Sequence, residues 1–180
     1  MIPVHGRGIQ RATMVALAVV APLLVLEPEA VSRAGWKPAT ARPLAEPPLT
    51  WHDVTVWGVE GRGWPELGRG RWFDRFPAEA EGKVTANVWQ LSHHSAGMLV
   101  RFRTDAATIW ANYALLREQL ALPNMTAIGV SGLDLYARDR AGKWRWVGVT
   151  HPVAKVVRQE IVAGLSPVMR EYALYLPLYN

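Results

Sequence analysis

Two alternating stretches joined by a short polar loop constrain the fold more than any other feature of this sequence. The stretch 132–139 places an apolar residue at every second position, which is the period of a strand with one face on a core. The stretch 143–150 alternates in the same way, with Trp144, Trp146 and Gly148 on one common face. The loop between them contains Gly142, which is free to adopt the positive φ of a tight turn. The two stretches are therefore predicted to form a β-hairpin.

Shorter alternating segments around this hairpin predict an all-β chain. Apolar and polar residues alternate at 98–103, at 109–113 and again at 172–178. Two segments, 115–122 and parts of 153–163, are compatible with helix, but both are short and are followed by residues that break helices. Several short strands without a βαβ rhythm favour a β-sandwich over a parallel sheet.

The first 34 residues are typical of an export signal. A basic start precedes the apolar run 14–26, and small residues at 32–34 offer a cleavage site. The run is too short to cross a bilayer core of about 30 Å as a helix, so a cleaved signal is favoured over an uncleaved membrane anchor. We therefore expect a secreted or periplasmic protein with no stable membrane span after signal cleavage. A proline-rich linker is predicted for 35–50 and the folded domain for 51–180.

Composition narrows the classes of function. With 50% hydrophobic and 19% charged residues, the 180-residue chain is ordinary for one domain that buries a core. The net charge of +5 is mild and the arginines are scattered, which does not favour nucleic acid as a partner. The chain has no cysteine, which excludes disulfides and thiolate metal sites. His93 and His94 are adjacent and point to opposite faces of an extended chain, so neither a metal nor a cofactor is expected.

Five sequence blocks carry a resemblance to a known family. They are "WGVEGRGW" (57–64), "LSHHSAG" (91–97), "VSGLDLY" (130–136), "WRWVG" (144–148) and "YLPLYN" (175–180). In this order they resemble the N-terminal domain that precedes the catalytic domain in SGNH/GDSL-type esterases. The G-x-D-L-Y signature of that domain corresponds to Gly132, Asp134, Leu135 and Tyr136. The resemblance implies a jelly-roll-like β-sandwich of carbohydrate-binding-module type, whose partner is an SGNH catalytic domain, normally in the same chain.

The sequence also departs from the pattern of the whole esterase. No Asp is followed by Ser, as a G-D-S-L motif requires, and no His follows an Asp by three residues, as a D-x-x-H pair requires. We therefore expect no catalytic residue in the chain, which corresponds to an accessory N-terminal domain whose catalytic domain is absent from these 180 residues. A fragment of a longer protein and a separate module both remain open.

An enzyme with a non-standard site is the least favoured alternative. Ser131, Asp134 and His151 follow the chain order of an α/β-hydrolase triad, but a triad is defined by geometry. The predicted hairpin places Asp134 on the polar face of a strand and offers no helix terminus for an oxyanion hole. We expect Asp134 instead to accept hydrogen bonds from backbone N–H groups of a neighbouring loop.

The tryptophan-flanked segment 57–64 is the candidate binding loop. Trp57 and Trp64 enclose Glu60 and Arg62, and exposed indole faces beside polar groups suit a polysaccharide or an acylated sugar. Packing of these indoles against the body of the domain, or against the catalytic domain, is the favoured reading of the same residues. His94 is expected to clamp a loop. A stand-alone carbohydrate-binding module is the alternative function.

Overall fold

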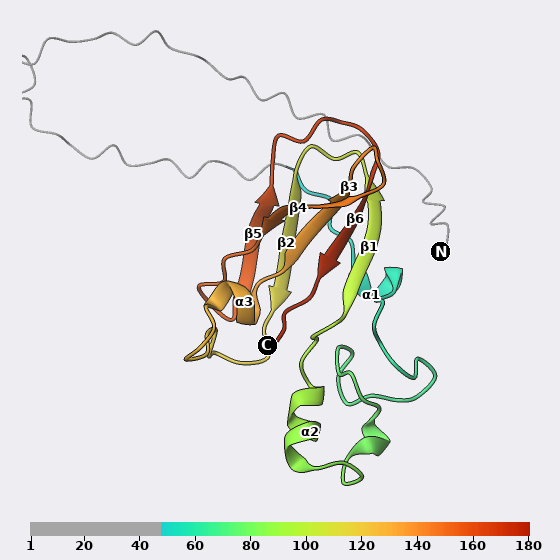
Figure 1. Ribbon diagram of the computed structural model, residues 1–180, viewed down its shortest axis with the longest axis vertical. Helices are drawn as coiled ribbons and strands as arrows, with labels where there is room; N and C mark the ends of the chain where they lie inside the picture. The colour runs from blue at the N-terminus through green and yellow to red at the C-terminus, as the bar shows by residue number, and fades with distance from the viewer. Residues whose placement is uncertain (1–47) are drawn as a thin grey trace, which may run out of the picture. The chain divides into compact units, whose positions relative to one another are not determined.

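The computed structural model describes residues 48–180, and one compact unit extends from His52 to Asn180 (Figure 1). The signal predicted for residues 1–34 and nearly all of the linker predicted for 35–50 lie outside the described residues. Within the described part of the chain, no helix is both long enough and apolar enough to cross a membrane.

Strands dominate the regular structure of this unit, which confirms the all-β prediction. The strands are β1 (Leu99–Thr104), β2 (Ile109–Ala114), β3 (Asp134–Arg138), β4 (Trp144–Val149), β5 (Val156–Val162) and β6 (Arg170–Tyr175). Three short α-helices, which the sequence analysis did not predict, are α1 (Val54–Trp57), α2 (Ala86–Ser92) and α3 (Ala127–Ser131). A 3-10 turn spans Ala78–Ala80.

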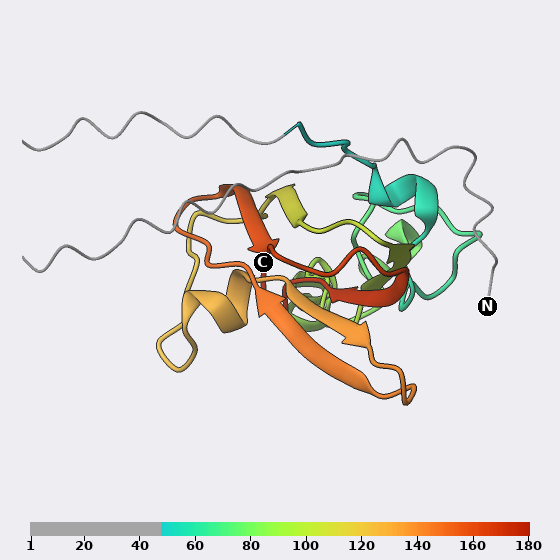
Figure 2. The same ribbon diagram turned by 90° about the horizontal axis from the view of Figure 1, so that it is seen from above.

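The strands form two antiparallel sheets. The larger sheet has the order β1-β6-β3-β4, so β6 lies between the first and third strands of the chain. The smaller sheet pairs β2 with β5. Seen from above, the β3–β4 hairpin extends away from the rest of the unit at the edge of the larger sheet (Figure 2).

The predicted β3–β4 hairpin is confirmed, with a bulge that the alternation did not reveal. Gly142 has a φ of 77°, as the turn requires. Leu135 lies opposite Gly148, but its neighbour Tyr136 lies opposite Trp146, so β4 carries one extra residue there. The bulge places Gly148 and Trp146 on opposite faces of the sheet. The prediction that they share a face was wrong.

The core lies on the inner face of the larger sheet. Val100, Leu135 and Tyr172 are fully buried, and Tyr172 stacks on Phe102 with ring centroids 5.3 Å apart. Gly148 allows β4 to approach β5, because a Cβ at this position would lie 2.6 Å from the carbonyl oxygen of Ile161. Burial of these apolar side chains is the main stabilising contribution available to a domain without disulfides.

The two segments that were compatible with helix have other structures. Residues 153–163 contain β5, whose pairing with β2 overrides the helix propensity of its Gln and Glu residues. Residues 115–122 contain no helix, because long-range partners take their N–H groups: Leu115 N–H donates to the Lys155 carbonyl at 2.8 Å, and Arg117 N–H donates to Asn180 Oδ1 at 2.6 Å.

Candidate functional site

The outer face of the larger sheet carries a group of aromatic side chains, Tyr136, Trp144, Trp146 and Tyr175, which we call the aromatic face. Tyr136 and Trp146 are direct cross-strand partners, and the bulge in β4 is what directs Trp146 outward beside Tyr136. Trp146 is 58% exposed. Exposed aromatic side chains gathered on one face of a sheet are typical of a surface that binds a ligand or another protein.

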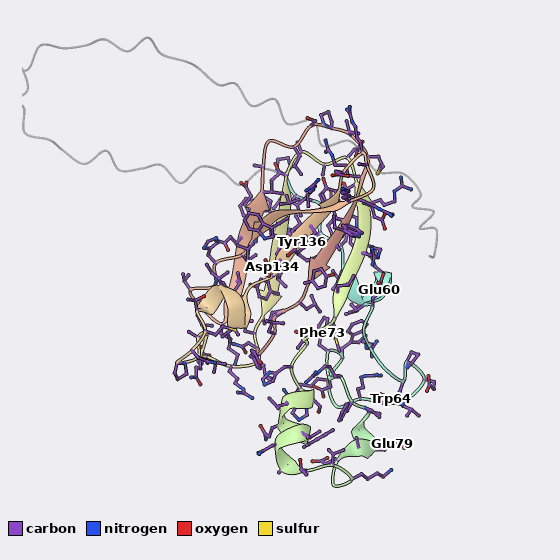
Figure 3. The ribbon with its side chains drawn as sticks, in the orientation of Figure 1. Glu60, Trp64, Phe73, Glu79, Asp134 and Tyr136 are labelled. Carbon is purple, nitrogen blue, oxygen red and sulfur yellow. The ribbon has the colours of Figure 1, made fainter. Side chains whose placement is uncertain are left out.

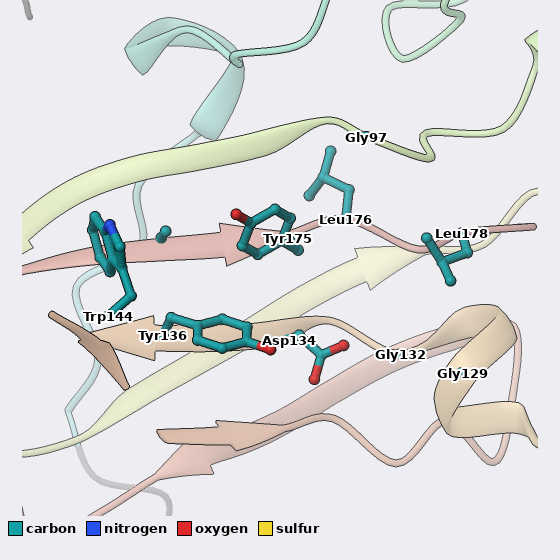
Figure 4. A pocket seen from close by; sticks show the side chains of 10 residues that line it. Gly97, Gly129, Gly132, Asp134, Tyr136, Trp144, Tyr175, Leu176 and Leu178 are labelled. Carbon is teal, nitrogen blue, oxygen red and sulfur yellow. The ribbon is translucent and has the colours of Figure 1, made fainter. Parts of the chain in front are cut away.

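A pocket of about 440 Å³ opens on this face (Figure 4). Asp134 and Tyr136 of β3 lie beside Tyr175 of β6, with Trp144 at one end and Leu178 at the other. The remaining lining residues are Gly97, Gly129, Gly132, Ala173 and Leu176. The pocket therefore combines aromatic walls with one carboxylate.

Hydrogen bonding and ring contacts fix the walls of this pocket. Trp146 Nε1–H donates to Asp134 Oδ1 at 3.2 Å, which holds the carboxylate against the sheet. The rings of Tyr136 and Tyr175 meet edge to face with centroids 5.6 Å apart, a favourable arrangement for aromatic quadrupoles.

A chain of ion pairs borders the aromatic face. Arg101 Nε donates to Glu60 Oε1 at 2.7 Å and Arg101 Nη1 lies 3.6 Å from Glu171, which also pairs with Arg138 at 3.1 Å. Both guanidinium groups lie near the ring of Trp144, at 5.2 and 5.8 Å from its centroid. The hydrogen bond from Arg101 lowers the pKa of Glu60, so its carboxyl group stays ionised at neutral pH.

The signature residues have separate roles. Position 132 has room only for glycine, because a Cβ there would lie 2.4 Å from the Ile128 carbonyl oxygen. Leu135 is buried in the core. Asp134 and Tyr136 line the pocket. The hydrogen bond that the structure gives Asp134 comes from the Trp146 indole, so the expected role as an acceptor of backbone N–H groups was wrong.

The non-standard triad is not assembled. Ser131 has no exposed surface, its hydroxyl donates to the Leu120 carbonyl at 2.9 Å, and it accepts from Asn180 Nδ2 at 3.1 Å. Asp134 is engaged with Trp146, and His151 is exposed. Ser131 ends the short helix α3, so no helix N-terminus stands behind its hydroxyl.

The predicted binding loop 57–64 is divided between different neighbours. Trp57 packs on Phe102 at 5.7 Å between ring centroids, and Glu60 pairs with Arg101 of β1. Trp64 instead meets Phe76 edge to face at 5.8 Å, in the part of the unit that contains the 3-10 turn, away from Asp134 and Tyr136 on the sheet (Figure 3). The other polar residue of the loop, the Arg62 guanidinium, stacks on Trp72 at 3.9 Å. The two flanking indoles thus have different partners, and the sugar-binding role of this loop stays a prediction.

A second pocket, of about 480 Å³, contains His94. His94 is 3% exposed, and Arg117 Nη2 lies 3.3 Å from its Nε2. The other lining residues are Asn87, Gln90, Leu91, Leu122 and Tyr179. We call this the His94–Arg117 pocket. The contact joins His94 to the loop residue Arg117, and the loop-clamping role of His94 stays a prediction.

Several site residues were missed by reasoning from the sequence alone. Trp144, Trp146 and Tyr175 were placed on strands but not in a site. The alternation put Trp144 and Trp146 on one face with Gly148, and it gave no such signal for Tyr175, which lies between Leu174 and Leu176. Arg117 and Asn180 gave no local signal, because their partners are far away in the sequence. Among residues 48–180, no group of three or more His, Asp or Glu side chains is arranged to hold a metal ion.

Two comparisons relate this geometry to known proteins. The family model described as "GxDLY: N-terminus of Esterase_SGNH_hydro-type" matches residues 49–180. The fold is also similar to the crystal structure of a protein described as a GDSL-like lipase from Bacteroides ovatus, with a TM-score of 0.62 and 29% identity over 70% of this chain. The chain covers 36% of the length of that protein. No curated protein matches the chain in sequence.

Proposed function

The chain belongs to the family of domains that form the N-terminus of SGNH-hydrolase-type esterases, and we propose that it serves such an esterase as an exported accessory domain without catalytic residues of its own. Its partner is an SGNH-type catalytic domain, normally in the same polypeptide. The share of the Bacteroides ovatus protein that this chain covers, 36%, supports this division into an N-terminal domain and a larger remainder.

The state of Ser131 is the observation that carries the proposal. A nucleophilic serine needs an exposed hydroxyl, a base within hydrogen-bond reach and an oxyanion site. Ser131 is buried, and its hydroxyl is engaged by a carbonyl oxygen and an amide instead of an imidazole. The serine that most resembles a nucleophile in the sequence therefore has a structural role.

A fluorophosphonate probe tests this proposal, because it labels activated serines covalently. We expect mass spectrometry of the labelled 180-residue chain to find no modified serine, whereas an SGNH-type esterase treated in parallel is labelled on its nucleophile. Stoichiometric labelling of Ser131, or of another serine, would contradict the proposal. Heat-unfolded chain serves as the control for non-specific reaction.

The finer fold type and the location belong to the same proposal. A jelly-roll-like sandwich of carbohydrate-binding-module type is supported by the two antiparallel sheets and by the return of β6 to lie beside β1. Export is supported by the basic, apolar and small-residue pattern of residues 1–34. Amino-terminal sequencing of the mature protein tests it, with cleavage near residue 34 as the expected result.

A second candidate function is carbohydrate binding, and the aromatic face is the observation that favours it. Exposed indole faces stack on sugar rings, and a carboxylate beside them can accept hydrogen bonds from hydroxyl groups. Trp144 and Asp134 line one pocket, and the exposed indole of Trp146 donates to the same Asp134 carboxylate beside it. This candidate is compatible with the first, since an accessory domain can hold a polysaccharide for the catalytic domain.

A further inference from the structure

The pocket on the aromatic face contains a carboxylate that has no cationic partner. Asp134 is half-buried, and its Oδ1 accepts a hydrogen bond from the Trp146 indole at 3.2 Å. None of the ion pairs among residues 48–180 includes Asp134. An indole N–H is a neutral donor, so it leaves the negative charge of the carboxylate uncompensated. The pocket therefore offers one unpaired negative charge to a ligand.

Aromatic rings stand beside this carboxylate. Tyr136 and Tyr175 line the same pocket with their ring planes 79° apart, so they form two walls at nearly a right angle. Trp144 lies at one end of the pocket (Figure 4). The π-face of each ring carries negative potential and attracts cations. Several rings around one cavity form the aromatic cages that bind quaternary ammonium groups.

The ring of Trp144 already has cations near it in this structure. The guanidinium groups of Arg101 and Arg138 lie 5.2 and 5.8 Å from its centroid. Both groups are paired with glutamates in the chain of ion pairs that borders the aromatic face, and neither arginine lines the pocket. The positive charges at this border are thus compensated, which leaves Asp134 to set the sign of the charge inside the pocket.

The rest of the lining favours a cation without N–H groups. Apart from the carboxylate and the two phenol groups, the lining side chains are aliphatic or absent: Gly97, Gly129, Gly132, Ala173, Leu176 and Leu178. A primary ammonium carries three donors and is strongly hydrated, so it loses hydrogen bonds against such a wall. A quaternary ammonium has no donor to satisfy. The volume of about 440 Å³ is that of a small-molecule site.

We propose that this pocket binds a quaternary ammonium group, which contacts the rings of Tyr136, Tyr175 and Trp144 and is neutralised by the carboxylate of Asp134. Two sources carry this chemistry: a small soluble compound and the choline headgroup of a lipid. The inference does not depend on the proposed function, because neither a catalytic domain nor a polysaccharide takes part in the binding.

Choline and its neutral isostere 3,3-dimethyl-1-butanol test the role of charge on the parent chain. In the alcohol a carbon atom replaces the nitrogen, so the shape is kept and the charge is lost. We expect choline chloride to shift the backbone amide NMR signals of Gly97 and Gly132 in a saturable way, with sodium chloride at equal ionic strength as the reference. The alcohol should bind at least about fivefold more weakly. Equal affinities, or no saturable shift at these glycines, would overturn the proposal.

Removal of the carboxylate charge tests the role of Asp134. Asp134→Asn keeps a side-chain oxygen that can accept from Trp146, so it should fold, as a melting curve confirms. It should weaken choline binding at least about threefold and leave the alcohol unaffected. Glu79→Gln, at an exposed position of the 3-10 turn far from the pocket (Figure 3), removes one negative charge as the matched control. Equal effects of the two variants on choline would overturn the proposal.

Removal of one ring tests the aromatic contribution. Tyr175→Leu keeps an apolar side chain but removes the π-face, so it should weaken the binding of choline more than that of the alcohol. Tyr179→Leu changes a comparably exposed tyrosine outside this pocket and should affect neither ligand. Equal weakening of both ligands by Tyr175→Leu would mean that the ring supplies only apolar surface, and would overturn the proposal.

Vesicles distinguish the two sources of the ammonium group. Co-sedimentation of the parent chain, but not of Asp134→Asn, with phosphatidylcholine vesicles supports a lipid headgroup. Saturable choline binding without co-sedimentation supports a soluble compound. The second candidate function gives the opposing result: shifts of Gly97 and Gly132 with acetylated xylan oligosaccharides, but none with choline, would overturn the proposal and assign the pocket to a sugar.

Discussion

Asn180 donates a hydrogen bond from its side-chain amide to the hydroxyl of Ser131, 3.1 Å away. This bond joins the last residue of the chain to the residue that precedes the G-x-D-L-Y signature. Asn180 also accepts from the Arg117 N–H at 2.6 Å and donates to the Gln119 carbonyl at 3.1 Å. One buried amide therefore ties three separate segments together.

Replacement of Asn180 tests how much these hydrogen bonds contribute to the stability of the domain. We expect Asn180→Ala to lower the free energy of unfolding by about 1–3 kcal/mol, because it leaves buried partners unsatisfied. Urea denaturation measures the change. Asn124→Ala, at an exposed loop position, is the matched control and should stay within about 0.5 kcal/mol of the parent chain. Equal stabilities for the two variants would show that the tie contributes little.

The first position of the signature should tolerate no side chain. A Cβ on Gly132 would lie 2.4 Å from the Ile128 carbonyl oxygen and 3.0 Å from the Thr150 carbonyl oxygen, and both neighbours are backbone atoms. Gly132→Ala should destabilise the domain by about 1–3 kcal/mol. In thermal melts, Gly68→Ala serves as control, since nothing lies within 4 Å of a Cβ there. An unchanged melting temperature in Gly132→Ala would refute the close approach.

Asp139 should matter more for stability than Asp134. Asp139 accepts hydrogen bonds from the Lys143 N–H at 2.8 Å and from Arg145 Nε at 2.9 Å, whereas Asp134 accepts one from Trp146. We expect Asp139→Ala to lower the melting temperature further than Asp134→Ala does. The opposite order would follow if Asp134 accepted hydrogen bonds from backbone N–H groups, as the sequence analysis expected. Equal melting temperatures would contradict the prediction.

The contribution of Asp139 should depend on pH. The hydrogen bond from Arg145, followed by that from the Lys143 N–H, lowers the pKa of Asp139 below 3.8. A lowered folded-state pKa means that the stabilisation is present above pH 3.8 and is lost as the pH falls through the folded-state value. The melting temperatures of the parent chain and of Asp139→Ala should therefore converge as the pH falls below the folded-state pKa of Asp139. A difference that persists in acid would contradict this assignment.

Two tryptophan substitutions distinguish sugar binding on the aromatic face from sugar binding on the 57–64 loop. If the aromatic face holds a polysaccharide, Trp146→Ala should weaken binding to acetylated xylan oligosaccharides at least about tenfold, while the free energy of unfolding changes by less than about 1 kcal/mol. Trp64→Ala, which removes a comparably exposed indole outside this face, is the matched control. Isothermal titration measures the oligosaccharide affinity of both variants. Loss of binding in Trp64→Ala alone would move the site to the 57–64 loop.

Local pattern was sufficient to predict the hairpin. Residues 132–150 alternate with period two and place Gly142 at the turn, so pleat and turn chemistry agree. The bulge opposite Leu135 was not predictable, because one extra residue in β4 leaves the alternation of each half intact. Because the pattern placed Trp146 and Gly148 on one face, it could not predict that Trp146 is exposed while Gly148 is buried.

Long-range pairing explains what the sequence did not reveal. Lys, Gln and Glu residues made 153–163 compatible with helix, and the pairing of β5 with β2 decided otherwise. The His94–Arg117 pocket depends on contacts between segments 23 residues apart in the chain. The sequence analysis singled out His94, but Arg117 carries no local signal, so the pocket could not be predicted before the fold was known.

Ester hydrolysis by the chain itself tests the central claim most directly. Purified residues 1–180, and the Ser131→Ala variant confirmed as folded by its melting curve, are compared with buffer in the hydrolysis of 4-nitrophenyl acetate. We expect neither protein to exceed the buffer rate beyond a trace that is equal in both, because Ser131 is buried and bound to Leu120 and Asn180. Saturable turnover by the parent chain that disappears in Ser131→Ala would contradict a non-catalytic accessory domain.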